Sequence, residues 1–305
     1  MSRPVITGVL FAAVLACAVW ALYKVEKDRA SLRSAMAADV PPEPAQPARA
    51  SASAVAGGSP SPDHHAPAPS RTSSVADSKS DPVPAETGPI KQGEILDYTA
   101  NVSELNNVAT LRLQVAARND FLGRPAWHLQ AFAHTQNPLR MVFELDDRFD
   151  SYSDASALTS FQYEMHLSER GQKVDSVQRM TITGKEPASA GASQTHVLPG
   201  TRDPLGMMQF LRTVDWSKTP EIHGPVYDGH KLYEVRASLA GSESVSVAAG
   251  SFSTSKVNLR VFDNGVEMKD AKFSLYLTQD AARTPVLLEA VLPFADARVE
   301  LTKSH

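Results

Sequence analysis

The stretch PGTRDPLGMMQFLRTV, residues 199–214, carries the strongest helix signal of the chain outside its N-terminus. Asp203 is a good N-cap, because its carboxylate can accept hydrogen bonds from the free N–H groups of the first helical turn. Pro204 follows at the first helical position, where its missing N–H costs nothing. Apolar side chains then recur at helical spacing and form one stripe: Leu205, Met207, Met208, Phe210 and Leu211. We therefore predict a short helix over residues 204–213.

Most of the sequence on both sides of this helix alternates between apolar and polar residues, as half-buried β-strands do. Strands are predicted around residues 96–102, 111–117, 127–134, 141–145, 161–167, 177–183, 233–239, 245–248, 252–262, 266–277, 285–292 and 297–301. Asn106-Asn107 is the predicted first turn, and Asp228-Gly229 and Asn264-Gly265 favour tight hairpins. The pattern predicts an all-β, mainly antiparallel domain, a curled sheet or open β-barrel of about ten strands that the short helix plugs.

Residues 1–35 contain a predicted membrane anchor. Val5–Tyr23 is a run of 19 residues without a charge. As a helix it would be about 28 Å long, which is close to the thickness of a bilayer core. We expect an uncleaved transmembrane helix in the bacterial inner membrane, crossing it once with the C-terminal part in the periplasm. Two alternatives remain open, a signal peptide cleaved near Ala16-Cys17-Ala18 and a lipoprotein signal acylated at Cys17.

Residues 36–89 form a predicted disordered linker. Eleven of the 21 prolines of the chain lie between Met36 and Pro89, among alanine, serine, aspartate and glycine. A segment of this composition cannot bury enough apolar surface to offset the entropy of ordering it. It would span about 40 Å as a flexible coil and about 170 Å as extended polyproline II. Residues 90–305 are then the β-rich periplasmic domain.

Composition excludes several classes of function. A formal net charge of −4 argues against a nucleic-acid partner, because nucleic-acid binders usually carry a basic patch. The single cysteine, Cys17, cannot form a disulfide within the chain, and it cannot build a cysteine metal site. We find no nucleophile elbow, phosphate loop or metal signature, so the expectation is a protein without cofactors that is not an enzyme.

The histidines and acidic residues show no catalytic spacing. His128 and His134 share a predicted strand face, but they lie six residues apart, about 20 Å, which is too far for one metal. The remaining histidines are scattered along the chain, and the preferred interpretation is surface or hydrogen-bonded side chains rather than ligands. Asp146, Asp147 and Asp150 could form a carboxylate cluster, and a solvated cluster near a turn is the preferred interpretation.

Short segments in a fixed order support a resemblance to a known family. They are Gly93–Tyr98, Arg148–Tyr152, Asp203–Leu205 with Phe210–Thr213, Ala249–Phe252, and Asp280 with Thr284–Val286. Together they make residues 92–303 resemble the bacterial family called domain of unknown function 3108. The resemblance implies an exported β-domain without an established activity. In architecture the predicted domain is also loosely similar to periplasmic lipoprotein carriers with an open barrel and a helical lid, an analogy of fold only.

The helix supplies most of the candidate ligand-binding residues, which are Trp127, Met207, Met208, Phe210, Leu211 and Arg212. Methionine adapts to varied apolar shapes, so these side chains could line a cavity for a lipid or an acyl chain. Core packing is the alternative for the apolar residues, and for Arg212 the alternative is stabilisation of the helix dipole. The leading hypothesis is a non-catalytic domain that binds a hydrophobic envelope component in the concave face of its sheet. An interaction scaffold for envelope proteins is the second hypothesis, and a cell-wall hydrolase is the third.

Overall fold

The computed structural model describes residues 88–182, 192–293 and 295–305. The predicted anchor at residues 1–35 and nearly all of the predicted linker lie outside these ranges, so both stay predictions. Within the described ranges, no helix is long and apolar enough to cross a membrane.

The described part of the chain contains fourteen strands, one 3₁₀ turn and one α-helix. In chain order they are β1 (Ile95–Val102), β2 (Leu105–Asp120), β3 (Pro125–Thr135), η1 (Leu139–Met141), β4 (Asp146–Asp154), β5 (Ser160–Glu169), β6 (Gln172–Thr181), β7 (Ser193–His196), α2 (Pro204–Thr213), β8 (Glu221–Tyr227), β9 (Leu232–Val247), β10 (Gly250–Asp263), β11 (Val266–Glu267), β12 (Lys272–Thr278), β13 (Pro285–Leu292) and β14 (Ala295–Ser304). The predicted all-β class and the position of the helix are confirmed, while the predicted number of about ten strands is too low.

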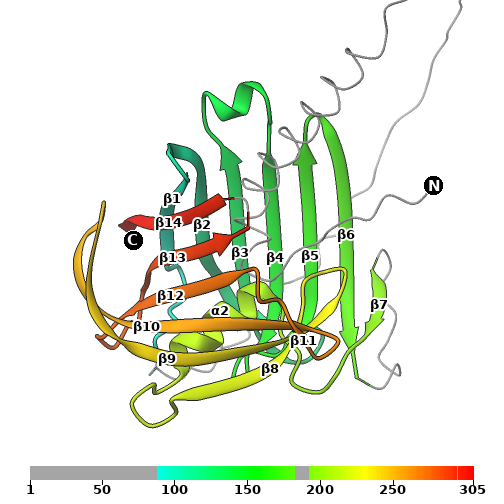
Figure 1. Ribbon diagram of the computed structural model, residues 1–305. Coiled ribbons are helices and arrows are strands. Elements are labelled where there is room, and N and C mark those ends of the chain that lie inside the picture. Colours follow the sequence, from blue (N-terminus) through cyan, green and yellow to red (C-terminus); the bar gives the residue numbers. More distant parts are fainter. Residues whose placement is uncertain (1–87, 183–191, 294) are drawn as a thin grey trace, which may run out of the picture. The chain divides into compact units, whose positions relative to one another are not determined.

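All the strands belong to one open sheet (Figure 1). Its order is β7-β6-β5-β4-β3-β2-β1-β14-β13-β12-β10-β9-β8, and β11 pairs with β10 beside this path. Every neighbouring pair is antiparallel except β6 and β7, which are parallel. Since β7 and β8 stand at the two ends of this order, the sheet keeps two edges and is not a closed barrel.

The sheet curls around α2, and the alternation of the strands decides which side faces the helix. On β1 the predicted face of Leu96, Tyr98, Ala100 and Val102 is buried throughout. The helix packs against β3, β4 and β8. One continuous hydrophobic core therefore fills the concave side of the sheet and includes the apolar side chains of the helix.

Two predicted boundaries are wrong for local reasons. The first hairpin turns at Ser103-Glu104, because Val102 pairs with Leu105. Asn107 instead lies within β2 with a φ of +53°, a conformation that asparagine tolerates, at an irregularity in the ladder. The predicted strand at 141–145 is also absent: Met141 is exposed in the η1 turn, and the next strand is the polar β4.

Candidate functional site

The N-terminus of α2 is fixed by a buried carboxylate. Asp203 Oδ1 accepts hydrogen bonds from the N–H groups of Leu205 at 2.8 Å and Gly206 at 2.9 Å, which confirms the predicted cap. Its Oδ2 accepts a hydrogen bond from the Ser151 hydroxyl on β4, and its own N–H donates to Ser160 Oγ at 2.7 Å. Burial raises the pKa of Asp203, and the hydrogen bonds offset only part of that rise. The cap therefore joins the helix directly to β4 and β5.

The C-terminus of α2 is fixed by a buried ion pair that the sequence did not reveal. Arg212 is fully buried, and its guanidinium forms two hydrogen bonds to the Glu94 carboxylate, at 2.6 and 2.8 Å. The same group donates to Gln209 Oε1 at 2.9 Å and to the carbonyl oxygens of Pro89 at 2.9 Å and Ala282 at 3.0 Å. Arg212 therefore connects the helix to the start of the domain, where the predicted linker ends.

The structure places the other predicted binding residues in the core or at its margin. Met207, Met208 and Leu211 are buried within the core cluster. Phe210 is half-buried, and the Arg202 guanidinium lies 3.6 Å from the centre of its ring. Trp127 is buried on β3, and its Nε1 donates to the Ala155 carbonyl at 3.2 Å. These residues share one core, and their predicted contact with a ligand stays a prediction.

The opposite face of the sheet carries a polar cluster across β3, β4 and β5. Asp150 lies at its centre and is 0% exposed, although it points away from the helix. Its carboxylate accepts hydrogen bonds from His128 Nε2 at 2.7 Å, from Gln130 Nε2 at 2.8 Å, and from Arg148 at 2.7 and 2.9 Å. Burial raises the pKa of Asp150, but these hydrogen bonds outweigh burial and hold it below its usual range. The interpretation of Asp150 as part of a solvated cluster is therefore wrong.

Two further side chains complete this cluster from β5. His166 Nε2 lies 3.4 Å from Glu164 Oε2 and 4.0 Å from Asp150 Oδ2. His166 Nδ1 lies 2.7 Å from the Asp175 carboxylate on β6. Burial lowers the pKa of His166, but the bonds to Asp175 and Glu164 raise it above its usual value. Only strand register brings these residues together, because Arg148 pairs with His166 and Asp150 with Glu164 across β4 and β5.

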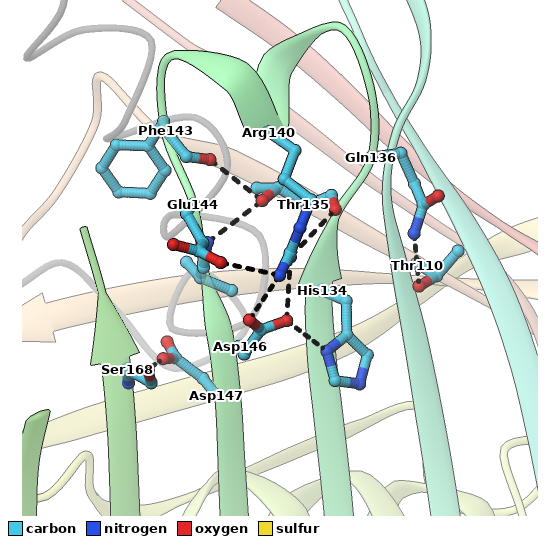
Figure 2. Close-up of polar contacts among 11 residues, drawn as sticks. Thr110, His134, Thr135, Gln136, Arg140, Phe143, Glu144, Asp146, Asp147 and Ser168 are labelled. Carbon is cyan, nitrogen blue, oxygen red and sulfur yellow. Dashed lines mark hydrogen bonds and ion pairs between the residues drawn. The ribbon is translucent and has the colours of Figure 1, made fainter. Parts of the chain in front are cut away.

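A second polar group lies at the η1 end of β3 and β4. Figure 2 shows the Arg140 guanidinium between the carboxylates of Asp146 and Glu144, with His134 on the other side of Asp146. Arg140 binds both oxygens of Asp146, at 2.9 and 2.7 Å, and His134 Nδ1 lies 2.8 Å away from one of them. The hydrogen bond from Arg140 lowers the pKa of Asp146 to about 2. This arrangement holds the η1 turn against the sheet, which is a structural role.

Residues 242–253 form a hairpin that we call the β9–β10 arm. It consists of the end of β9, the turn at residues 248–249 and the start of β10. It runs past the neighbouring strands (Figure 1), because pairing with β8 ends at Ser238 and pairing with β12 ends at Thr254. One face of the arm is lined by serine hydroxyls, from Ser242, Ser244, Ser246, Ser251 and Ser253. Val245 and Phe252 on the other face pack against the core cluster. The arm therefore adds an exposed strand edge to the folded core.

Fold and site together define a mostly antiparallel, open-sheet β-domain in which the helix α2 belongs to the core. The chain belongs to the family described as Protein of unknown function (DUF3108), whose model matches residues 97–302. The predicted family is thereby confirmed. No curated protein matches the chain.

Several solved structures are similar to this chain at low identity. A β-barrel-like protein of the DUF1849 family from Brucella abortus is 12% identical, with a TM-score of 0.46, over 70% of this chain and 97% of its own. A predicted lipoprotein from Parabacteroides distasonis is 11% identical, with a TM-score of 0.33, over 72% of this chain and 98% of its own. A predicted exported protein with a YmcC-like fold from Bacteroides fragilis is 11% identical, with a TM-score of 0.27, over 72% of this chain and 98% of its own.

Proposed function

We propose that this protein is a non-catalytic scaffold of the bacterial cell envelope that docks other envelope proteins. The apolar segment 5–23 anchors it in the inner membrane, and the proline-rich linker carries the folded domain into the periplasm. The observation that carries the proposal is the fixation of α2 at both ends, by Asp203 and by Arg212. A helix held in this way belongs to a packed interior, so binding takes place on the surface.

The energetics of the two helix ends support this interpretation. Loss of an N-cap costs about 0.5–2 kcal/mol. Separating a buried ion pair so that one charge stays unpaired costs about 3–5 kcal/mol. A helix that opened as a lid would break both sets of contacts, and it would also expose Met207, Met208 and Leu211. Recognition at an exposed edge requires none of these losses.

The docking element that we propose is the β9 edge of the β9–β10 arm. Antiparallel pairs alternate between residues that exchange backbone hydrogen bonds and residues that do not. The Ser253 carbonyl accepts from the Gln279 N–H on the side away from β9, so Ser253 and its partner Ser244 form a pair that does not exchange such bonds. The Ser244 N–H therefore points away from β10. An extended segment of a partner can add a strand there.

The test is crosslinking in cells that express the full-length chain, followed by pull-down. Ser244→Pro removes the outward N–H without removing a bond of the β9–β10 ladder, so recovery of the crosslinked partner should fall. Ser244→Ala is the matched control, because it removes the hydroxyl and keeps the N–H. Unchanged recovery with Ser244→Pro, or no stoichiometric partner with the native chain, would contradict the proposal.

The second candidate function is binding of a hydrophobic envelope component, a lipid or a lipoprotein acyl chain, in the concave face of the sheet. Phe210 is only half-buried, and the neighbouring Met207 and Met208 side chains can adopt other shapes. Native mass spectrometry of the full-length chain, followed by organic extraction, tests it. A lipid in defined ratio that Met208→Asp releases from a folded protein would favour this function over the scaffold.

A further inference from the structure

The polar cluster on the outer face contains three potential metal ligands from two neighbouring strands. One oxygen each of Asp150 and Glu164 and one ring nitrogen of His166 lie within 4.8 Å of one another. Tetrahedral zinc with ligand bonds of about 2.1 Å requires ligand atoms about 3.4 Å apart. His166 Nε2 is already 3.4 Å from Glu164 Oε2 and 4.0 Å from Asp150 Oδ2. The Glu164 oxygen is thus already at coordinating distance from Nε2, and side-chain rotation can bring the Asp150 oxygen closer.

The orientation of His166 is that of a metal-binding histidine. Metal-bound histidines usually direct their second nitrogen at a carboxylate, which fixes the ring and its tautomer. Here Asp175 lies 2.7 Å from Nδ1, so a proton on Nδ1 would leave the Nε2 lone pair free to bind a metal held between Asp150 and Glu164. Asp150 is oriented in the same manner, by His128 Nε2 and Gln130 Nε2. The potential ligands are therefore held in place by residues that would not contact the metal.

The charges in the cluster leave room for a cation. Asp150, Glu164 and Asp175 bring three carboxylates together, and the Arg148 guanidinium bonds to one of them, Asp150. Arg148 now covers Asp150 Oδ2 at 2.7 Å, the oxygen that faces His166. Its side chain is 49% exposed, so it can turn towards solvent when a dication takes its place beside Asp150. A dication at the cluster would take over the charge balance that Arg148 supplies.

We propose that Asp150, Glu164 and His166 form a binding site for a first-row transition dication, with Arg148 competing for Asp150. One imidazole nitrogen and two carboxylate oxygens suit zinc and its neighbours in the first transition row better than magnesium or calcium, which prefer oxygen ligands alone. The three protein ligands leave at least one coordination position open to solvent. The site is distinct from the β9–β10 arm and goes beyond the proposed docking function.

The experiment measures zinc binding by equilibrium dialysis of the full-length chain, with His64→Gln and His65→Gln in every variant. These two substitutions remove the one adjacent histidine pair of the chain as a competing site. We expect one zinc ion per chain, with affinity reduced about 10–100-fold in Asp175→Asn and further in Glu164→Gln and His166→Gln. Arg148→Ala should bind more tightly than the native cluster, because it removes a competing positive charge.

His134→Gln is the matched control, because His134 also contacts an aspartate on the same sheet face but lies outside the three ligands. It should bind zinc as the native cluster does. Cobalt provides a spectroscopic readout, since its visible absorption bands should change in Asp175→Asn and stay unchanged in His134→Gln. The proposal would be overturned if Glu164→Gln and His166→Gln both bound zinc with native affinity. It would also be overturned if neither the native cluster nor Arg148→Ala bound zinc. Circular dichroism confirms that each variant is folded.

Discussion

Replacing Arg212 by methionine should be among the most destabilising single changes in the domain. The substitution keeps much of the side-chain volume and leaves Glu94, which is 12% exposed, without its partner. It also removes the hydrogen bonds to the carbonyl oxygens of Pro89 and Ala282. Removing one partner of a buried pair costs about 3–5 kcal/mol. For a domain of this size the melting temperature should fall by about 6–20 °C.

Urea unfolding followed by tryptophan fluorescence measures this loss. Trp216 is a local probe, because its Nε1 donates to the Leu211 carbonyl one residue before Arg212. Arg112→Met is the matched control. Arg112 forms a similar two-point contact with Asp97, at 2.7 and 3.1 Å, but its side chain is 50% exposed. Exposed pairs contribute about 0–1 kcal/mol, so the control should change stability little.

A double-mutant cycle separates the ion pair from the rest of the site. Glu94→Gln combined with Arg212→Met leaves no unpaired buried charge, so the double variant should be more stable than the sum of the single losses predicts. If Arg212→Met destabilises the protein no more than Arg112→Met does, then the helix is not fixed at its C-terminus. The helix would then be free to open at that end, and the interior would not be closed by it.

Three further predictions concern α2, one hairpin and the η1 turn. Gly206→Ala should destabilise the protein by about 1–3 kcal/mol in urea unfolding, although alanine usually favours helices, because its Cβ would lie 2.9 Å from Ser153 Oγ and 3.0 Å from the Leu158 carbonyl. Gly229→Ala should lower the melting temperature more than Gly265→Ala: φ is positive at both, at +97° and +79°, but only at Gly229 would the Cβ meet Met165, at 2.5 Å. Because the pKa of Asp146 is lowered, its carboxylate stabilises the folded state fully at pH values above its unfolded pKa near 3.8. This stabilisation is lost as the pH falls to about 2. Asp146→Asn should therefore flatten the pH dependence of unfolding in that window.

The parts of the fold that local chemistry decides could be predicted from the sequence. The helix begins at Pro204 because Asp203 caps it, and the cap and the proline both act on the first turn, so they leave a local signal in the sequence. The faces of β1 and β3 follow from period-two alternation, which holds where one side of a strand meets the core. The β10–β11 turn follows from Asn264-Gly265, where two positive φ angles are required.

The parts that depend on long-range register could not be predicted. β4 was missed because its inward side chains include Asp147, Ser151 and Ser153, so it lacks the hydrophobic alternation of its neighbours. Those groups are buried because they bond to partners far along the chain, such as Asp203, 52 residues from Ser151. The ion pair of Arg212 with Glu94 spans 118 residues and left no local signal. Whether a polar strand residue is buried depends on its hydrogen-bond partner, and sequence spacing does not reveal that partner.

The polar strand β4 explains why the core and the outer face can be tested separately. Consecutive residues of a strand point to opposite faces, so Ser151 supports the helix cap while Asp150 organises the outer cluster. Substitutions at Glu164, His166 and Arg148 change side chains on the outer face and leave the contacts of Asp203 and Arg212 in place. Loss of zinc without loss of stability would then locate the effect in the cluster. Loss of both would mean that the outer cluster acts only by holding the sheet together.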